Sequence, residues 1–144
     1  MKKSLLKKVA IIITLCIASC CIFSCYAQKQ IEYYSEKENY VCVVGVVSKF
    51  QYNEDRTALY IDFTDLSPTL DDTCFKIVGD NLKIVKDNLI DDKVLEGKQV
   101  SFTTAPRYFG DGYILPIVAM YVDGECLLDF ENGYKNLLKW LKEE

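Results

Sequence analysis

The segment YVCVVGVVSKF, residues 40–50, decides the fold, and it predicts a long β-strand. Five of its residues are valine, and β-branched side chains fit the pleated surface of a sheet. Gly45 stands in the middle of the segment and predicts a β-bulge or a sharp bend, where a side chain would obstruct a neighbouring element. We therefore expect a sheet to be built around residues 40–50.

The residues that follow supply further strands and two helices. Residues 57–65 alternate, with Leu59, Ile61 and Phe63 on one face, which is typical of a half-buried strand. Three more strands are predicted over residues 73–78, 99–104 and 113–122, and a helix begins near Asp80 or Asn81. An apolar stripe at helical spacing predicts a C-terminal helix over residues 131–144.

This order of elements, the interrupted first strand and the Leu-x-Gly-Lys-x-Val pattern at residues 95–100 resemble the OB-fold. The resemblance implies a mainly β domain over residues 40–130, a five-stranded OB-like Greek-key barrel. It also implies a helix between strands 3 and 4, with the C-terminal helix added. More narrowly, the chain resembles bacterial lipid-anchored proteins with a tRNA-anticodon-binding-like OB domain, a name that describes shape and not activity.

The first 19 residues read as an export signal. Four lysines precede an apolar stretch at residues 9–18, which matches the h-region of a signal peptide and is shorter than a membrane span. The following Ile17-Ala18-Ser19-Cys20 resembles the lipobox of bacterial lipoproteins. That resemblance implies cleavage before Cys20, a lipid such as palmitate on that thiol, and a lipid-anchored tether over residues 20–39. Lipidation at Cys25, cleavage after Ala27 with release of a soluble protein, and a retained membrane anchor stay open.

Charge separates the signal from the exported part. The whole chain carries a formal charge of −4, all 21 acidic residues follow residue 20, and four of the 17 basic residues precede it. The exported part therefore carries about −8. Nucleic-acid binding depends largely on neutralising phosphates with Lys and Arg, so a nucleic-acid partner is disfavoured.

The residues for catalysis are largely missing from the sequence. The chain has no histidine, which excludes a His-based triad and a His-ligated metal, and it has neither a nucleophile elbow nor a phosphate-binding glycine loop. Adjacent carboxylates occur in turns, where we interpret them as solvated. Asp62, Asp65, Asp71 and Asp72 are candidate calcium ligands, but they lack the fixed glycine and the terminal glutamate of a calcium loop. We therefore expect neither enzymatic activity nor a cofactor or metal.

The cysteines of the domain are too few for a disulfide framework. Three of the seven cysteines, Cys42, Cys74 and Cys126, lie beyond the signal and its junction. We predict that Cys42 and Cys74 are small core residues on strands. A disulfide involving Cys126 and a reactive thiol are the alternatives.

An exposed ligand-binding surface is a better functional candidate than a catalytic or metal site. OB-folds bind ligands on strands 2 and 3 and on the loops joining strands 1–2 and 4–5. Mapped onto this chain, that face holds both arginines beside aromatic rings, a combination that suits sugars or protein partners. The candidate ligand-binding residues are Phe50, Tyr52, Arg56, Tyr60, Arg107, Tyr108, Phe109 and Tyr113. The alternative is that the rings fill the barrel ends and the arginines pair with acids.

The sequence thus predicts a binding module of the cell envelope. It would be anchored by an N-terminal lipid on the extracytoplasmic side and would bind an envelope protein, peptide or glycan. An accessory or structural subunit of a membrane complex is the first alternative. A carboxylate-based hydrolase and a nucleic-acid binder follow behind it.

Overall fold

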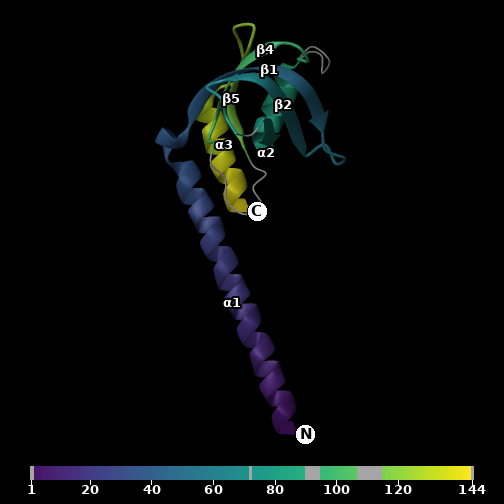
Figure 1. Cartoon of the computed structure of the whole chain (residues 1–144), viewed down its shortest axis with the longest axis vertical. Coiled ribbons are helices and arrows are strands. Elements are labelled where there is room, and N and C mark those ends of the chain that lie inside the picture. The colour runs from purple at the N-terminus through teal and green to yellow at the C-terminus, as the bar shows by residue number, and fades with distance from the viewer. Residues whose placement is uncertain (1, 72, 90–94, 107–114, 144) are drawn as a thin grey trace.

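A six-stranded antiparallel sheet forms the centre of the protein (Figure 1). The computed structural model describes residues 2–71, 73–89, 95–106 and 115–143. The elements in chain order are α1 (Lys2–Ser35), the short 3-10 helix η1 (Lys37–Asn39), β1 (Val41–Tyr52), β2 (Ala58–Ser67), β3 (Cys74–Val78), α2 (Gly79–Asn88), β4 (Gln99–Thr104), β5 (Ile117–Val122), β6 (Glu125–Leu128) and α3 (Phe130–Glu143).

The predicted fold class was wrong. The structure is 47% helix and 35% strand, so it is not mainly β, and its sheet is open with six strands and not a five-stranded barrel. The strand order β3-β2-β1-β4-β5-β6 leaves β3 and β6 at the edges. Two features caused the error. The positive-φ turn at Asp123 and Gly124 folds residues 125–128 back onto β5 as an unpredicted strand, and the signal segment continues as one long helix.

The central strand is β1, which pairs with β2 on one side and with β4 on the other. Its register against β2 shifts between Val44 and Val46, so the predicted irregularity at Gly45 is confirmed. A Cβ atom at Gly45 would lie 2.8 Å from Leu66 Cδ2. The glycine therefore lets the neighbouring strand pack closely at the bend.

One face of the sheet carries the main core. Leu59, Ile61 and Phe63 are buried on β2, which confirms the predicted alternation. Phe63 stacks on Phe102 of β4 at 4.4 Å between ring centroids, and Phe75 of β3 meets both rings edge-on. Three strands are thereby joined by one aromatic cluster.

The cysteines do not belong to this core. Cys42 on β1 and Cys74 on β3 are exposed, so their predicted burial was wrong, and Cys126 on β6 is exposed as well. Alternation explains the result, because Val43 points into the core and Cys42 therefore points to the opposite face. The apolar run of residues 40–50 is buried on one face only.

The helices α2 and α3 cover the sheet on the side of the long helix α1 (Figure 1). Asp129 caps α3 by accepting a hydrogen bond from the backbone N–H of Asn132, and this bond lowers the pKa of the Asp129 carboxyl. Buried Asn81 of α2 donates to the carbonyl oxygen of Gly133 at 2.8 Å. It also accepts a bond from Asn136 at 3.0 Å, so the two helices are joined by a satisfied polar link.

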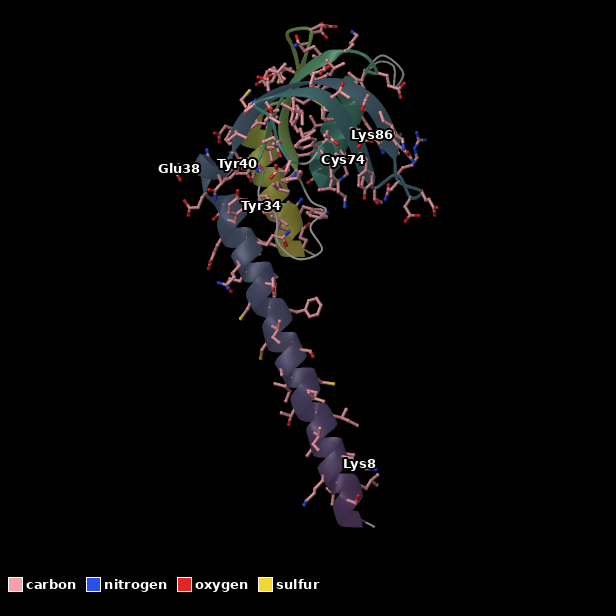
Figure 2. The ribbon with its side chains drawn as sticks, in the orientation of Figure 1. Lys8, Tyr34, Glu38, Tyr40, Cys74 and Lys86 are labelled. Atoms are coloured by element: carbon pink, nitrogen blue, oxygen red, sulfur yellow. The ribbon has the colours of Figure 1, made fainter. Side chains whose placement is uncertain are left out.

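The end of α1 packs on α3 and not into solvent (Figure 2). Tyr34 is fully buried in a cluster with Leu137 and Val118. Tyr40 donates a hydrogen bond to the carbonyl oxygen of Tyr34 at 2.8 Å, and Tyr134 donates to that of Ser35. The expected tether over residues 20–39 is thus helical up to Ser35, and its last turn belongs to the domain.

A solvent-exposed ion pair adds a further contact between the end of α1 and α3. Lys37 lies 2.8 Å from Glu131, and its ammonium group also lies over the rings of Phe130 and Tyr134. Burial raises the pKa of Tyr34 and that of Tyr40 above the usual tyrosine range, so both phenols are neutral at physiological pH. We call the contacts of Tyr34, Ser35, Lys37 and Tyr40 with α3 the α1–α3 junction.

Replacing Tyr34 with alanine tests how much the α1–α3 junction contributes to the stability of the folded protein. Truncating a fully buried aromatic ring leaves a cavity, so we expect Tyr34→Ala to lower the free energy of unfolding by about 2–4 kcal/mol. Thermal unfolding of the full chain in detergent, followed by near-UV circular dichroism, measures the change. Tyr26→Ala on the same helix is the matched control, because Tyr26 is 55% exposed. Equal effects of both substitutions would contradict a packed junction.

Candidate functional site

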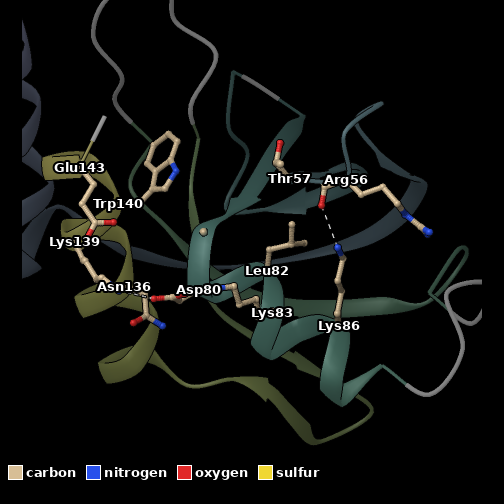
Figure 3. A pocket seen from close by; sticks show the side chains of 11 residues that line it. Arg56, Thr57, Asp80, Leu82, Lys83, Lys86, Asn136, Lys139, Trp140 and Glu143 are labelled. Carbon is tan, nitrogen blue, oxygen red and sulfur yellow. Dashed lines mark hydrogen bonds and ion pairs between the residues drawn. The ribbon is translucent and has the colours of Figure 1, made fainter.

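A groove lies between α2, α3 and the β1–β2 turn (Figure 3). Its volume is about 450 Å³. The lining residues are Arg56, Thr57, Gly79, Asp80, Leu82, Lys83, Lys86, Asn136, Lys139, Trp140 and Glu143. We refer to this site as the α2–α3 groove.

The α2–α3 groove is basic although the protein is acidic. Four of the lining side chains are cations and two are carboxylates, so the lining carries a net formal charge of +2 against −4 for the whole chain. The cations come from three elements: the β1–β2 turn, α2 and α3. Their convergence makes the groove a local attractor for anions.

Asp80 organises the α3 side of the groove. Its two carboxylate oxygens lie 2.7 Å from the ammonium group of Lys83 and 2.9 Å from that of Lys139. Hydrogen bonds from these two lysines lower the pKa of Asp80 to about 2. Asp80 is therefore ionised at neutral pH and unsuited to act as a general acid there. Its role in the groove is to hold two lysines at fixed positions.

The opposite side of the groove is built around the ring of Tyr52. The guanidinium carbon of Arg56 and the ammonium nitrogen of Lys86 each lie 5.0 Å from that ring's centroid. Lys86 also donates a hydrogen bond to the carbonyl oxygen of Arg56 at 3.0 Å (Figure 3). Arg56 has a φ of 56°, so this lysine secures a turn residue with left-handed backbone. Tyr52 itself meets Phe50 edge-on at 5.7 Å.

The only tryptophan of the chain, Trp140, stands at the groove. Lys76 lies 5.8 Å from the Trp140 ring and 5.6 Å from the ring of Tyr60, so one cation lies between two aromatic faces. The start of α2 passes close to the indole, because a Cβ at Gly79 would lie 3.0 Å from Trp140 Cδ1. Gly79 has a φ of 58°, which suits glycine at this bend.

The structure describes four of the eight predicted ligand-binding residues: Phe50, Tyr52, Arg56 and Tyr60. Arg56 lines the groove, Tyr52 stacks under it, and Tyr60 reaches its border through Lys76. Phe50 is partly buried against the main core and contributes packing. The other four, Arg107, Tyr108, Phe109 and Tyr113, lie outside the described residues.

The calcium candidates do not form a site in the part of the chain that the structure describes. There, no group of three or more Asp, Glu or Cys side chains is arranged to hold a metal ion. Asp62 and Asp65 lie on β2, Asp71 follows that strand, and Asp72 falls outside the described residues.

Sequence reasoning did not predict that Lys83, Lys86, Lys139 and Trp140 share one groove. The lysines are spread over α2 and the C-terminal helix, where charges on a helix surface usually mean a solvated face. The packing of α2 on α3, through the polar link from Asn81 and the Asp80–Lys139 ion pair, brings the two helices side by side and gathers these charges. The sequence did contain a weak indication of a shared cationic surface, because Lys83 and Lys86 stand at i and i+3 and therefore lie on one face of the predicted helix.

The N-terminal helix is long and apolar enough to cross a membrane by length and composition. An 18-residue window within Ser4–Ser35 has a mean hydropathy of 2.4, a property that signal sequences share. Large exposed apolar side chains run along this helix: Leu5, Leu6, Val9, Ile11, Ile12, Ile13, Leu15, Ile17, Ile22, Phe23 and Tyr26. An apolar surface of this extent is compatible with a signal peptide or a membrane anchor.

Comparison with protein-family models, with curated protein sequences and with solved structures found no match to this chain. The resemblance to lipid-anchored proteins therefore stays a prediction from the residues alone. The groove and the apolar helix carry the functional argument.

Proposed function

We propose that the protein is a non-enzymatic binding module of the cell envelope, anchored through its N-terminus on the extracytoplasmic side. Its ligand is an envelope protein, peptide or glycan that carries negative charge, bound in the α2–α3 groove. The anchor is a lipid on Cys20, which lies exposed on α1. The single observation that carries the proposal is a cationic groove on an otherwise acidic protein.

The geometry of the groove supports binding over catalysis. Arg56 and Lys86 line one side of the groove and Lys83 and Lys139 the other, and the Arg56 side chain extends away from Asp80 (Figure 3). Arginine on a tyrosine ring offers a planar fork for carboxylates or phosphates, and the lysines add point charges. The one carboxylate shared by both helices, Asp80, is occupied by two ion pairs.

Neutralising two groove lysines tests this proposal. The double variant Lys83→Gln and Lys86→Gln lowers the formal charge of the lining from +2 to 0. We expect the affinity for a deca-glutamate peptide to fall about tenfold, since about 1.4 kcal/mol of lost attraction gives that factor. The full chain is held in phosphatidylcholine nanodiscs, and the emission of Trp140 reports binding. Added salt should weaken the wild-type affinity.

Two further variants complete the design. Lys49→Gln removes an exposed lysine of β1 outside the groove lining and should leave the affinity unchanged. Asp80→Asn frees Lys83 and Lys139 from their ion pairs and should tighten peptide binding. The α2–α3 groove would be overturned as the ligand site if the wild-type protein did not bind the peptide. An equal loss of affinity in the Lys49→Gln control would overturn it as well.

A further inference from the structure

We infer that the α1–α3 junction holds the α2–α3 groove toward the membrane that carries the protein, so that the cations of the groove attract the anionic phospholipid headgroups of that membrane. This inference rests on the proposed function, because it uses the same groove. It adds a fixed orientation and a membrane-borne ligand.

The orientation follows from a helix that does not end in a flexible linker. α1 is continuous to Ser35, and Tyr34 is fully buried against α3. Two phenol hydroxyls, one from Tyr40 and one from Tyr134, are bonded to the carbonyls of the last α1 turn. A helix fixed at its last turn by a buried ring, two hydrogen bonds and the neighbouring Lys37–Glu131 pair moves together with its domain.

The helices that line the groove lie on the membrane side of the sheet. Along the long axis of the molecule, α2 and the C-terminal end of α3 stand between the sheet and the N-terminus of α1 (Figure 1). Lys8 marks the far end of α1, and Tyr34 marks its contact with the domain (Figure 2). The last turns of α3 supply Lys139, Trp140 and Glu143 to the groove.

The distances along the two helices bring the end of α3, which supplies Lys139, Trp140 and Glu143 to the groove, close to the headgroups. At 1.5 Å per residue, Tyr34 stands about 21 Å beyond Cys20, and α3 returns about 9 Å toward the membrane between Leu137 and Glu143. With a lipid on Cys20, the end of α3 lies about 12 Å above that residue, against a headgroup layer of roughly 5–8 Å and a Debye length of about 8 Å.

Charge complementarity selects the occupant. The four cations of the groove exceed its two carboxylates, and Lys142 adds a further exposed cation on the last turn of α3. Each lysine or arginine near an anionic lipid surface adds to the electrostatic attraction. The indole of Trp140 suits the membrane interface, where its apolar ring and its polar N–H are both accommodated.

Quenching of Trp140 measures this contact directly, because the chain has no other tryptophan. The full chain is placed in nanodiscs of phosphatidylcholine alone or with one third phosphatidylglycerol, each containing a lipid with a nitroxide on its headgroup. We expect about twofold stronger quenching in the anionic nanodiscs, reversed by high salt. The Lys83→Gln and Lys86→Gln double variant should lose this increase, and Lys49→Gln should keep it.

The outcomes separate this inference from the proposed function. Quenching that does not respond to anionic lipid, in a protein whose Trp140 still reports deca-glutamate, overturns the headgroup contact and leaves a diffusible acidic ligand. Failure with both the lipid and the peptide overturns both proposals. Anionic-lipid quenching that survives in the double variant shows contact outside the groove and also overturns the inference.

Discussion

Gly133→Ala should destabilise the domain strongly, because the added methyl group would overlap the backbone of β5. A Cβ atom at this position would lie 1.8 Å from the backbone oxygen of Val118 on β5 and 2.6 Å from its carbonyl carbon. The obstacle is backbone in the middle of a sheet, so α3 must move away from β5. The exchange also carries a helix-propensity gain of about 1 kcal/mol, which the overlap outweighs.

We expect Gly133→Ala to lower the free energy of unfolding by about 3 kcal/mol and the midpoint of thermal unfolding by roughly 10 °C. Displacement of α3 also strains the bond from Asn81 to the Gly133 carbonyl, which joins the two groove helices. Lys135→Ala on the exposed side of α3 is the control and should change the midpoint little. A variant as stable as the wild type would show that α3 does not pack on β5 this closely.

Cys20→Ser should abolish labelling of the protein by a fatty acid supplied to the cells. The thiol at position 20 is exposed on α1 and follows the small residues Ala18 and Ser19, as the lipobox resemblance requires. Serine keeps the size of the side chain and removes the sulfur that would carry the lipid. Metabolic labelling followed by gel analysis gives the result. Membrane retention, measured by fractionation, should fall with it.

Three outcomes distinguish the alternatives at this end of the chain. Cys21→Ser and Cys25→Ser are matched controls, exposed on the same helix, and should keep the label. A label that persists in Cys20→Ser and disappears in Cys25→Ser would move the lipid to Cys25. A wild-type protein that is membrane-bound but never labelled would favour α1 as a retained span, which its length and composition allow.

Local patterns in the sequence predicted most individual elements. The alternation of residues 57–65 and the valine-rich run at 40–50 were sufficient for β2 and β1, because each strand buries one face in the same core. The predicted strand over residues 99–104 coincides with β4. The local patterns could not predict whether the sheet closes into a barrel or stays open. Whether strands form a barrel or an open sheet depends on pairings between distant segments, and β6 has only four residues.

The candidate site was predicted in part, for the same reason. Arg56 beside Tyr52 was predicted from residues four positions apart, and the structure stacks them. Lys86, which lies over the same ring, and Lys139, on the other side of the groove, come from helices whose packing no local pattern encodes. Burial of Cys42 was predicted from its valine neighbours, whereas the pleat directs it outward. The amino-acid composition of a segment indicates that it forms a strand. Only the register of that strand determines which of its side chains point into the core.

The α1–α3 junction also sets the order in which the molecule can be completed. The hydrogen bond from Tyr134 to Ser35 joins residues 99 positions apart, and the Lys37–Glu131 pair spans 94. Such separations give a high contact order, and loop closure over them is slow. The N-terminal end of the chain is synthesised first, and its last helical turn cannot be fixed until α3 has been made. Folding of the domain and fixing of α1 against it are therefore one late event.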